Sequence, residues 1–253
     1  MTWNWRWRWR GAAGVPSAKP RASRGVRILR WTLYLVSLWV VLTVGPVILF
    51  RFVDPPTTAF IVADRVASWT GETQYPLHHR WVDWRDISGN AKVAVIAAED
   101  QKFPDHHGFD LESIEKAIAE RERGGRQRGA STISQQVAKN LFLWSESSWL
   151  RKGLEVYFTV LIELFWDKQR ILEVYLNVAE FGRGVFGVGA AADQFYGKSA
   201  KSLSTEQAAR LAAVLPSPKR YSVTDPGRYV QRRTRQIQRQ MRKLGGTGYL
   251  ARL

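Results

Sequence analysis

Cysteine is absent from this chain of 253 residues. A protein in an oxidising compartment tolerates that absence because a missing thiol cannot mispair, but cytosolic proteins also lack cysteine. The zinc-protease spacing His-Glu-x-x-His is missing too, and the adjacent residues His106 and His107 cannot share one face of a helix. Cysteine therefore does not decide the compartment, and we expect no metal site in the protein.

Strand-like alternation of useful length is also missing. After Ala91, apolar residues recur at three- and four-residue spacing, and Gly and Pro residues separate the stretches in which they do so. The pattern predicts a mainly α fold, with helices over residues 111–121, 131–143, 150–165, 171–178, 190–196, 205–215 and 229–244.

Acidic residues are scarce at both ends of the chain. Residues 1–30 contain eight Lys and Arg and no acid, and residues 217–253 contain ten with a single acid. Residues 51–216 hold 20 basic and 21 acidic residues, so the net charge of +16 belongs to the two ends. A nucleic-acid-binding domain is expected to carry a basic stripe on its own surface, so we expect no nucleic-acid partner.

A long apolar run extends from Ile28 to Phe50 and contains one charge, Arg30. About 20 apolar residues cross a bilayer as a helix, whereas a cleavable signal peptide has a shorter apolar core and small residues at its exit. The eight basic residues of the N-terminal end all lie at or before Arg30, so the positive-inside rule predicts an uncleaved anchor with a cytoplasmic N-terminus. The alternative is a buried core helix, which would need polar flanks within a folded domain.

Five regions are predicted: a basic cytoplasmic tail (1–27), a transmembrane anchor (28–50), a membrane-proximal region (51–88), a helical domain (89–220) and a basic C-terminal helix (221–253). The membrane-proximal region is expected to contain one helix near Ala59–Trp69. The C-terminal helix carries Val230, Ile237 and Met241 on one face and arginines on the others. It is expected either to lie on anionic lipid headgroups or to pack its apolar face on the domain.

Two adjacent carboxylates, Glu99 and Asp100, follow the apolar run Val93–Ala98. If that run is a helix, Glu99 lies near its C-terminal end, beside an apolar wall, where the helix dipole disfavours an anion. Both effects raise the pKa of a carboxyl group and suit it to accept a proton near neutral pH. Taken alone, however, a Glu-Asp pair at the end of a helix is more commonly exposed to solvent than catalytic.

A second group of polar residues follows Gly129. In a helix, Ile133, Val137 and Leu141 form a buried stripe, and the polar residues share two neighbouring faces: Ser131, Gln135 and Lys139 on one, and Thr132, Gln136 and Asn140 on the other. The glycine lets a ligand approach the free N–H groups at the helix start, which predicts an anion site. Hydroxyls, amides and a lysine suit sugars and phosphate, although a solvated polar face explains them equally.

A third group spaces Arg151 and Lys152 four and three residues before Glu155, which an ordinary ion pair on a helix surface also explains. In a fourth group, Ile171 and Tyr175 are expected to fill the core and Asn177 to end a helix.

In this order, the groups resemble the peptidoglycan glycosyltransferase family that uses lipid II. The family's motifs read E-D-x-x-F-x-x-H-x-G, G-G-S-T-I-T-Q-Q, R-K-x-x-E and I-L-E-x-Y-L-N, and their counterparts here are Glu99–Gly108, Gly129–Gln136, Arg151–Glu155 and Ile171–Asn177. A fifth match runs from Gly187 to Lys198, so the resemblance covers roughly residues 90–220. It is closest to the monofunctional proteobacterial members, because the transpeptidase motifs Ser-x-x-Lys and Lys-Thr-Gly are missing.

The resemblance implies a lysozyme-like, mainly α glycosyltransferase domain with a membrane-embedded edge. Glu99 is implied to be the general base on the acceptor's sugar 4-hydroxyl, which attacks the donor's anomeric carbon with inversion and displaces a polyprenyl pyrophosphate. Glu155 is expected near the leaving group, where it fixes basic residues or a divalent cation. Lys139, Arg151 and Lys152 are expected to stabilise the pyrophosphate charge, and the other expected substrate-binding residues are Ser131, Gln135, Gln136 and Asn140.

Three positions depart from the family pattern. Ala130 and Ser134 replace Gly and Thr in the second motif, and both changes are small. Ser147 stands where members often carry an Arg that helps to hold the donor pyrophosphate. Neutralisation of the pyrophosphate charge is therefore expected to depend more heavily on Lys139, Arg151 and Lys152.

The implied partners are lipid II, the growing glycan strand, the membrane and other proteins of cell-wall synthesis. No cofactor is expected to bind tightly, although the resemblance leaves room for a divalent cation, Mg²⁺ or Mn²⁺. The implied location is the bacterial inner membrane, with the catalytic domain in the periplasm. Two rival functions are a lysozyme-like wall-cleaving enzyme, against which the basic residues around a second Glu argue, and a non-catalytic scaffold, against which the intact motifs argue.

The topology gives a first prediction. Alkaline phosphatase fused after Leu253 should be active in intact cells, because everything after Arg51 is expected to lie outside the cytoplasm. A reporter that works only in the cytoplasm, fused at the same point, should be inactive. The reverse pair of results would overturn the topology.

Overall fold

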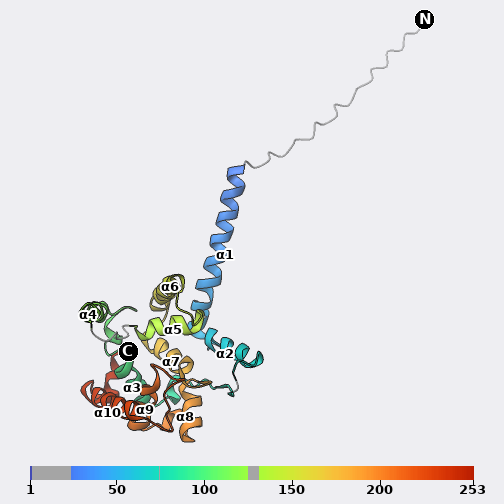
Figure 1. Ribbon diagram of the computed structural model, residues 1–253. Helices are drawn as coiled ribbons and strands as arrows, with labels where there is room; N and C mark the ends of the chain where they lie inside the picture. The colour runs from blue at the N-terminus through green and yellow to red at the C-terminus, as the bar shows by residue number, and fades with distance from the viewer. Residues whose placement is uncertain (2–23, 74, 125–130) are drawn as a thin grey trace. The chain divides into compact units, whose positions relative to one another are not determined.

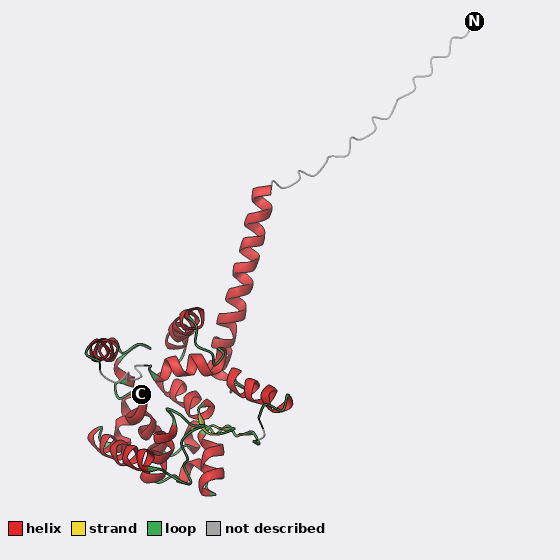
Figure 2. Ribbon diagram, viewed as in Figure 1, coloured by secondary structure: helices red, strands yellow, loops and turns green. Residues whose placement is uncertain are grey.

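The computed structural model describes residues 1, 24–73, 75–124 and 131–253. Helices dominate this part of the chain, and its strands are short (Figure 2). The α-helices are α1 (Arg24–Phe52), α2 (Ala59–Trp69), α3 (Gly89–Glu99), α4 (Leu111–Glu122), α5 (Ile133–Phe142), α6 (Trp149–Phe165), α7 (Lys168–Val178), α8 (Val188–Tyr196), α9 (Thr205–Val214) and α10 (Arg228–Lys243). The predicted mainly α class is confirmed.

Helix α1 has 29 residues and is long and apolar enough to cross a membrane. The chain forms two compact units, residues 1–42 and 43–253, so the last turns of α1 belong to the second unit. There, the indole nitrogen of Trp166 donates a hydrogen bond to the carbonyl of Val47 over 2.7 Å, and the guanidinium of Arg170 donates to the carbonyl of Phe50 over 3.0 Å. The end of the segment predicted as the anchor therefore packs within the helical unit.

Helix α3 forms the centre of the second unit. It is apolar on nearly every side, and a helix of that kind can be stable only when it is surrounded. Helices α9 and α10 and the short 3-10 helix η4 (Gly246–Arg252) pack around it (Figure 1). Lys92 is its one buried charged residue; the ammonium donates to the carbonyl of Trp84 over 2.7 Å and lies 3.8 Å from the centre of the Trp84 ring.

Helices α5, α6 and α7 pack together beside this centre. Ile133, Val137 and Leu141 form the buried stripe of α5, as predicted, and Ile171 and Tyr175 of α7 are buried as expected. The polar side of α5 therefore turns away from the core, toward the cavities described below.

A small three-stranded sheet joins the membrane-proximal region to the domain. Its order is β1 (His78–His79), β3 (Val185–Phe186) and β2 (Glu180–Gly182), with β1 parallel and β2 antiparallel to β3. Strands of two or three residues carry no readable alternation, which explains why the sequence did not predict them. Gly184 has a positive φ of 71°, and a Cβ at this position would lie 2.5 Å from the carbonyl of Pro76.

The boundaries of most helices agree with the sequence pattern to within a few residues, and α2 coincides with the expected Ala59–Trp69. Asn177 was wrongly expected to end a helix, since α7 continues to Val178 and Asn177 is fully buried. The Asn177 amide accepts from the N–H of Val82 over 2.8 Å and donates to the carbonyl of the same residue over 2.9 Å. It thus attaches the segment before α3 to α7.

The C-terminal helix α10 packs on the domain, the second of its two expected arrangements. Val230, Ile237 and Met241 are buried, and α10 contacts both α9 and α3. The region beyond residue 220 is therefore part of the folded unit.

The two hydrogen bonds between Asn177 and the backbone of Val82 give a stability prediction. Asn177→Ala leaves the N–H and C=O of Val82 without their partner, which should cost about 2–3 kcal/mol of unfolding free energy and lower the Tm of the full chain in detergent. The control is Gln236→Ala, which removes an exposed amide from α10. An equal, small effect of both changes would contradict the assigned role.

Candidate active site

Glu99 is the last residue of α3, and its carboxylate accepts a hydrogen bond of 2.8 Å from the side-chain amide of Gln136 on α5. Loss of hydration on burial raises the pKa of the Glu99 carboxyl above its ordinary value, and the neighbouring Asp100 adds to this. The hydrogen bond from Gln136 and the positive charges of Arg233 and Lys139 oppose the rise. The carboxyl group is therefore held between two opposing influences, as suits a group that exchanges a proton.

Gln136 is itself held in place from the other side. The hydroxyl of the buried Tyr175 donates to the Gln136 side-chain oxygen over 3.1 Å, which leaves the Gln136 NH₂ group to face Glu99. Burial raises the pKa of the Tyr175 hydroxyl well above its usual value, and the negative charges of Glu99 and Asp100 add to the effect. Tyr175 therefore remains a neutral donor at the end of a chain of two hydrogen bonds.

Asp100 has a structural task. Its side-chain oxygens accept from the ring nitrogen Nε2 of His106 over 2.9 Å and from the backbone N–H of Ile133 over 3.1 Å. Ile133 is the first residue of α5, so the carboxylate lies at the positive end of that helix dipole. Asp100 thereby ties the end of α3 to the start of α5 and places Glu99 opposite Gln136.

The start of α5 corrects one expectation from the sequence. The anion site expected there is taken by the protein's own Asp100 carboxylate. Thr132 and Gln135 close a capping box, in which the Thr132 hydroxyl accepts from the Gln135 N–H and the Gln135 side chain accepts from the Thr132 N–H. Residues 125–130, which directly precede Ser131 and include Gly129 and Ala130, lie outside the described part of the chain.

A second buried carboxylate, Glu155, lies on α6 and is 3% exposed. One oxygen accepts from Arg151 over 2.7 Å, and the other forms an ion pair with Lys152. The sequence suggested a surface ion pair as the alternative, but the Glu155 carboxylate is buried and the Arg151 side chain is only 11% exposed, while Lys152 reaches the same carboxylate from the surface. The Arg151 Nε atom is buried and has no hydrogen-bond partner among the residues that the structure describes.

Lys139 on α5 lies within the influence of both carboxylates. Burial lowers the pKa of the Lys139 ammonium, the positive charges of Arg151 and Lys152 lower it further, and the negative charges of Glu155 and Glu99 oppose this. The ammonium also lies 5.4 Å from the ring centre of Phe60 on α2. Lys139 is thus the cation that connects the Glu99 side of the site to the Glu155 side.

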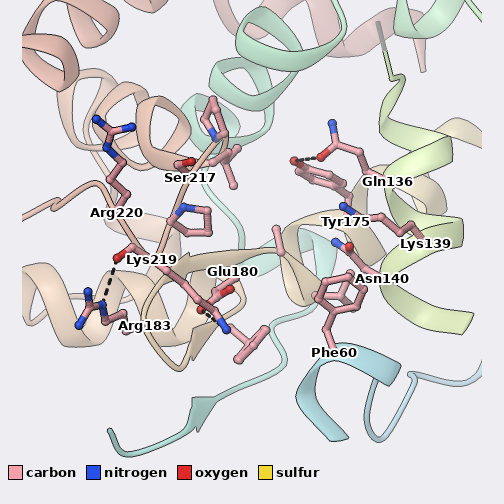
Figure 3. A pocket seen from close by; sticks show the side chains of 16 residues that line it. Phe60, Gln136, Lys139, Asn140, Tyr175, Glu180, Arg183, Ser217, Lys219 and Arg220 are labelled. Carbon is pink, nitrogen blue, oxygen red and sulfur yellow. Dashed lines mark hydrogen bonds and ion pairs between the residues drawn. The ribbon is translucent and has the colours of Figure 1, made fainter. Parts of the chain in front are cut away.

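Several of these residues line two cavities. The larger, of about 650 Å³, is lined by Gln136, Lys139 and Asn140 of α5, by Tyr175, and on the opposite side by the segment 215–220 (Figure 3). The smaller, of about 280 Å³, is lined by Glu99 and its neighbours up to Lys102, and by Ser131 and Thr132. Glu99 lines the smaller cavity and its partner Gln136 lines the larger, so their hydrogen bond links the walls of the two cavities.

The larger cavity contains charged residues that the sequence analysis did not select: Glu180, Arg183, Lys219 and Arg220. Lys219 forms an ion pair with Asp64 of α2 at 3.0 Å and lies 3.9 Å from Glu180 (Figure 3). Burial raises the pKa of the Glu180 carboxyl to about 7, and Lys219 opposes this rise. Lys219 and Arg220 directly follow Pro216 and Pro218, which usually indicates a solvated turn, and Glu180 and Arg183 lie in a glycine-containing segment between predicted helices.

The structure brings the predicted residues together in three places. Glu99 and Ser131 line the smaller cavity; Gln136, Lys139 and Asn140 line the larger; Arg151 and Lys152 form a separate cluster around the buried Glu155. Gln135 lies in the capping box and not at a cavity wall. Ser147, at the position where an Arg was expected, is exposed just before α6.

A divalent cation would need oxygen ligands at this site. Among the described residues, no group of three or more His, Asp or Glu side chains is arranged to hold a metal. Both Glu155 oxygens already accept from cationic side chains. The residues present do not form a ready cation cage, and we derive no step through one.

The comparisons with known proteins agree with the geometry. Residues 66–242 match the model of the family described as transglycosylase. The chain belongs to the transglycosylase family. Its domain is mainly α and lysozyme-like, as the resemblance implied.

Relatives of this transglycosylase match it along almost their whole length. A protein of Xanthomonas campestris pv. campestris (strain B100) is 57% identical over 232 residues, which are 91% of this chain and 94% of the relative. A protein of Pseudomonas putida (strain KT2440) is 56% identical over 227 residues, which are 90% and 94% of the two chains. Both relatives are named biosynthetic peptidoglycan transglycosylase.

The cluster on α6 gives a prediction for the transglycosylase domain. Glu155→Gln leaves the buried Arg151 guanidinium without its counter-charge, which should cost about 3 kcal/mol of unfolding free energy. Denaturant unfolding of the full chain in detergent measures the loss. The matched control is Glu146→Gln, which neutralises an exposed carboxylate just before the same helix. If both variants unfold like the wild type, the cluster is not a fixed part of the fold.

Proposed function

We propose that this protein is a peptidoglycan glycosyltransferase, which polymerises lipid II into glycan strands by inverting transfer with Glu99 as the general base. Its membership of the transglycosylase family and the names of its relatives support the reaction class. The intact glutamates and the basic residues on α5 and α6 support the catalytic assignment.

One observation carries the proposal: the Glu99–Gln136 hydrogen bond joins a residue that lines the smaller cavity to a residue that lines the larger one. The smaller cavity, beside Glu99, suits the sugar of the acceptor. The larger cavity contains Lys139 and three further basic residues, and it suits a donor whose leaving group is a pyrophosphate. A base on one side and cations on the other is the arrangement that this transfer requires.

The Glu99 carboxylate accepts the proton of the acceptor's sugar 4-hydroxyl as that oxygen forms a bond to the donor's anomeric carbon. The bond from that carbon to the pyrophosphate oxygen breaks, and its electron pair leaves with the polyprenyl pyrophosphate. Attack and departure on opposite faces of the sugar invert the anomeric centre. The raised pKa of the Glu99 carboxyl makes it a stronger base than an exposed glutamate, while the Gln136 hydrogen bond keeps it ionised.

The leaving group needs neutralisation of charge more than it needs a proton. Lys139 lies at the wall of the larger cavity, and preorganised cations of this kind stabilise the charge that develops in a transition state. Arg151 and Lys152 act from behind Lys139, held by Glu155. Glu155 thus fixes the cations and does not transfer a proton itself.

The substrate is tethered to a membrane, and the surface of α6 suits that location. Apolar side chains on its outer face leave an apolar stripe in contact with solvent; Trp149 is 93% exposed and Leu164 is 70% exposed. Exposed stripes of this kind mark membrane or partner contacts. We assign this face to the bilayer of the bacterial inner membrane, with α1 as the single span and the catalytic domain on the periplasmic side.

The decisive test is Glu99→Gln. The amide has the size of the acid but cannot accept a proton, so turnover of purified labelled lipid II should fall about 10²–10⁴-fold. The variant should still unfold at the wild-type temperature and bind a donor-site phosphoglycolipid such as moenomycin, because the larger cavity is intact. Asp100→Asn serves as the comparison; its two hydrogen-bonded partners predict a loss of stability, whereas Glu99→Gln should lose the chemical step alone. If the Glu99→Gln protein is active, the assignment of Glu99 as the general base is wrong.

A further inference from the structure

The C-terminal segment contacts the backbone of the turn that carries Glu99. Arg233 of α10 donates from its guanidinium to the carbonyl of Ala98 over 2.8 Å, and the Tyr249 hydroxyl donates to the carbonyl of Gln101 over 2.7 Å. Both acceptors lie within two residues of Glu99. A segment more than 130 residues later in the chain therefore holds the catalytic turn on both sides.

Arg233 occupies a particular place at this turn. Ala98 is the next-to-last residue of α3, whose carbonyls at this end lack partners within the helix and carry its negative dipole. A guanidinium there caps the helix end and sets a fixed positive charge beside the Glu99 carboxylate. The side chain is neither fully buried nor fully exposed, while its neighbours Arg232 and Arg235 are exposed.

The charged and titratable groups that act on Glu99 come from four elements. They are Arg233 of α10, Lys139 of α5, Asp100 at the end of α3, and Tyr175 of α7. Of the two cations, Lys139 lies at the wall of the larger cavity, where the donor's pyrophosphate would contact it. Burial also lowers the pKa of its ammonium group. Arg233 lies behind the turn and lines neither cavity, and a guanidinium keeps its charge at every working pH.

We propose that Arg233 is a positioning residue for the transfer, which fixes the backbone of the turn that carries Glu99 and holds a permanent positive charge beside its carboxylate. The inference rests on Glu99 as the general base. It assigns to the C-terminal helix a task in the chemistry of the site, beyond its packing on the domain.

The test is the pH dependence of lipid II polymerisation by Arg233→Gln in the full chain. A base works when it is deprotonated, so the rate falls as the pH drops through the pKa of Glu99. Removal of Arg233 removes an influence that lowers this pKa, so the acid limb of the profile should move to higher pH. At a pH on that limb the variant should be at least about threefold slower than the wild type, with a much smaller deficit on the alkaline plateau.

Two companions separate this effect from a loss of packing. Arg232→Gln removes the same charge from the same helix at an exposed position, and its acid limb should stay in place. Arg233→Lys keeps the charge but loses the planar donor, and it should recover part of the shift. Thermal unfolding of each variant reports stability, which lowers the whole profile without moving its limb.

The outcomes distinguish the inference from the proposed function. If Glu99→Gln is inactive and Arg233→Gln has the acid limb of the wild type, Arg233 is a helix cap alone and the inference is wrong. If Arg232→Gln moves the limb as far as Arg233→Gln, the effect is one of overall charge, and the inference is again wrong. If Glu99→Gln is active, the proposed base itself fails, whatever Arg233 does.

Discussion

The site depends on one interaction, the contact of the Asp100 carboxylate with the first N–H of α5 and with His106. Helix α3 is almost entirely apolar and buried, so its position is set by the core. Helix α5 approaches from a distant part of the sequence, and the charge-assisted bond at its N-terminus fixes where it meets α3. With the two helix ends joined in this way, Glu99 and Gln136 face each other, and Tyr175 orients the Gln136 amide.

The contact between the end of α3 and the start of α5 also explains how a carboxylate at the C-terminal end of an apolar helix remains a usable base. Desolvation alone would favour the protonated acid, and the α3 dipole acts in the same direction. The opposing contributions come from the Gln136 amide, Lys139 and Arg233, which belong to α5 and α10 and not to the helix that carries the base. Proton affinity at Glu99 is therefore a property of the tertiary structure and cannot be read from the first motif by itself.

Particular residues show how far the sequence could lead. Helical spacing placed the core stripe of α5 correctly, and α2 was located without error, because periodicity and breakers are local signals. Gln135 was grouped with the substrate-binding face, yet the spacing of Thr132 and Gln135 is also that of a capping box, which is its structural place. Asn177, Arg183 and Lys219 could not be placed, since their partners lie 36 to 155 residues away in the chain.

Glu155 and Glu99 have different surroundings, and these suit them to different tasks. Glu155 has a cationic side chain on each oxygen, so both of its oxygens are already engaged and its charge is balanced within the cluster. Glu99 has a neutral amide on one oxygen and a cavity before it, so it keeps both its charge and its access to a hydroxyl. Lys139 lies between them and is influenced by both. In the proposed transfer, a proton accepted at Glu99 would make the surroundings of Lys139 more positive at the moment when negative charge leaves on the pyrophosphate, so the two halves of the reaction would assist each other electrostatically.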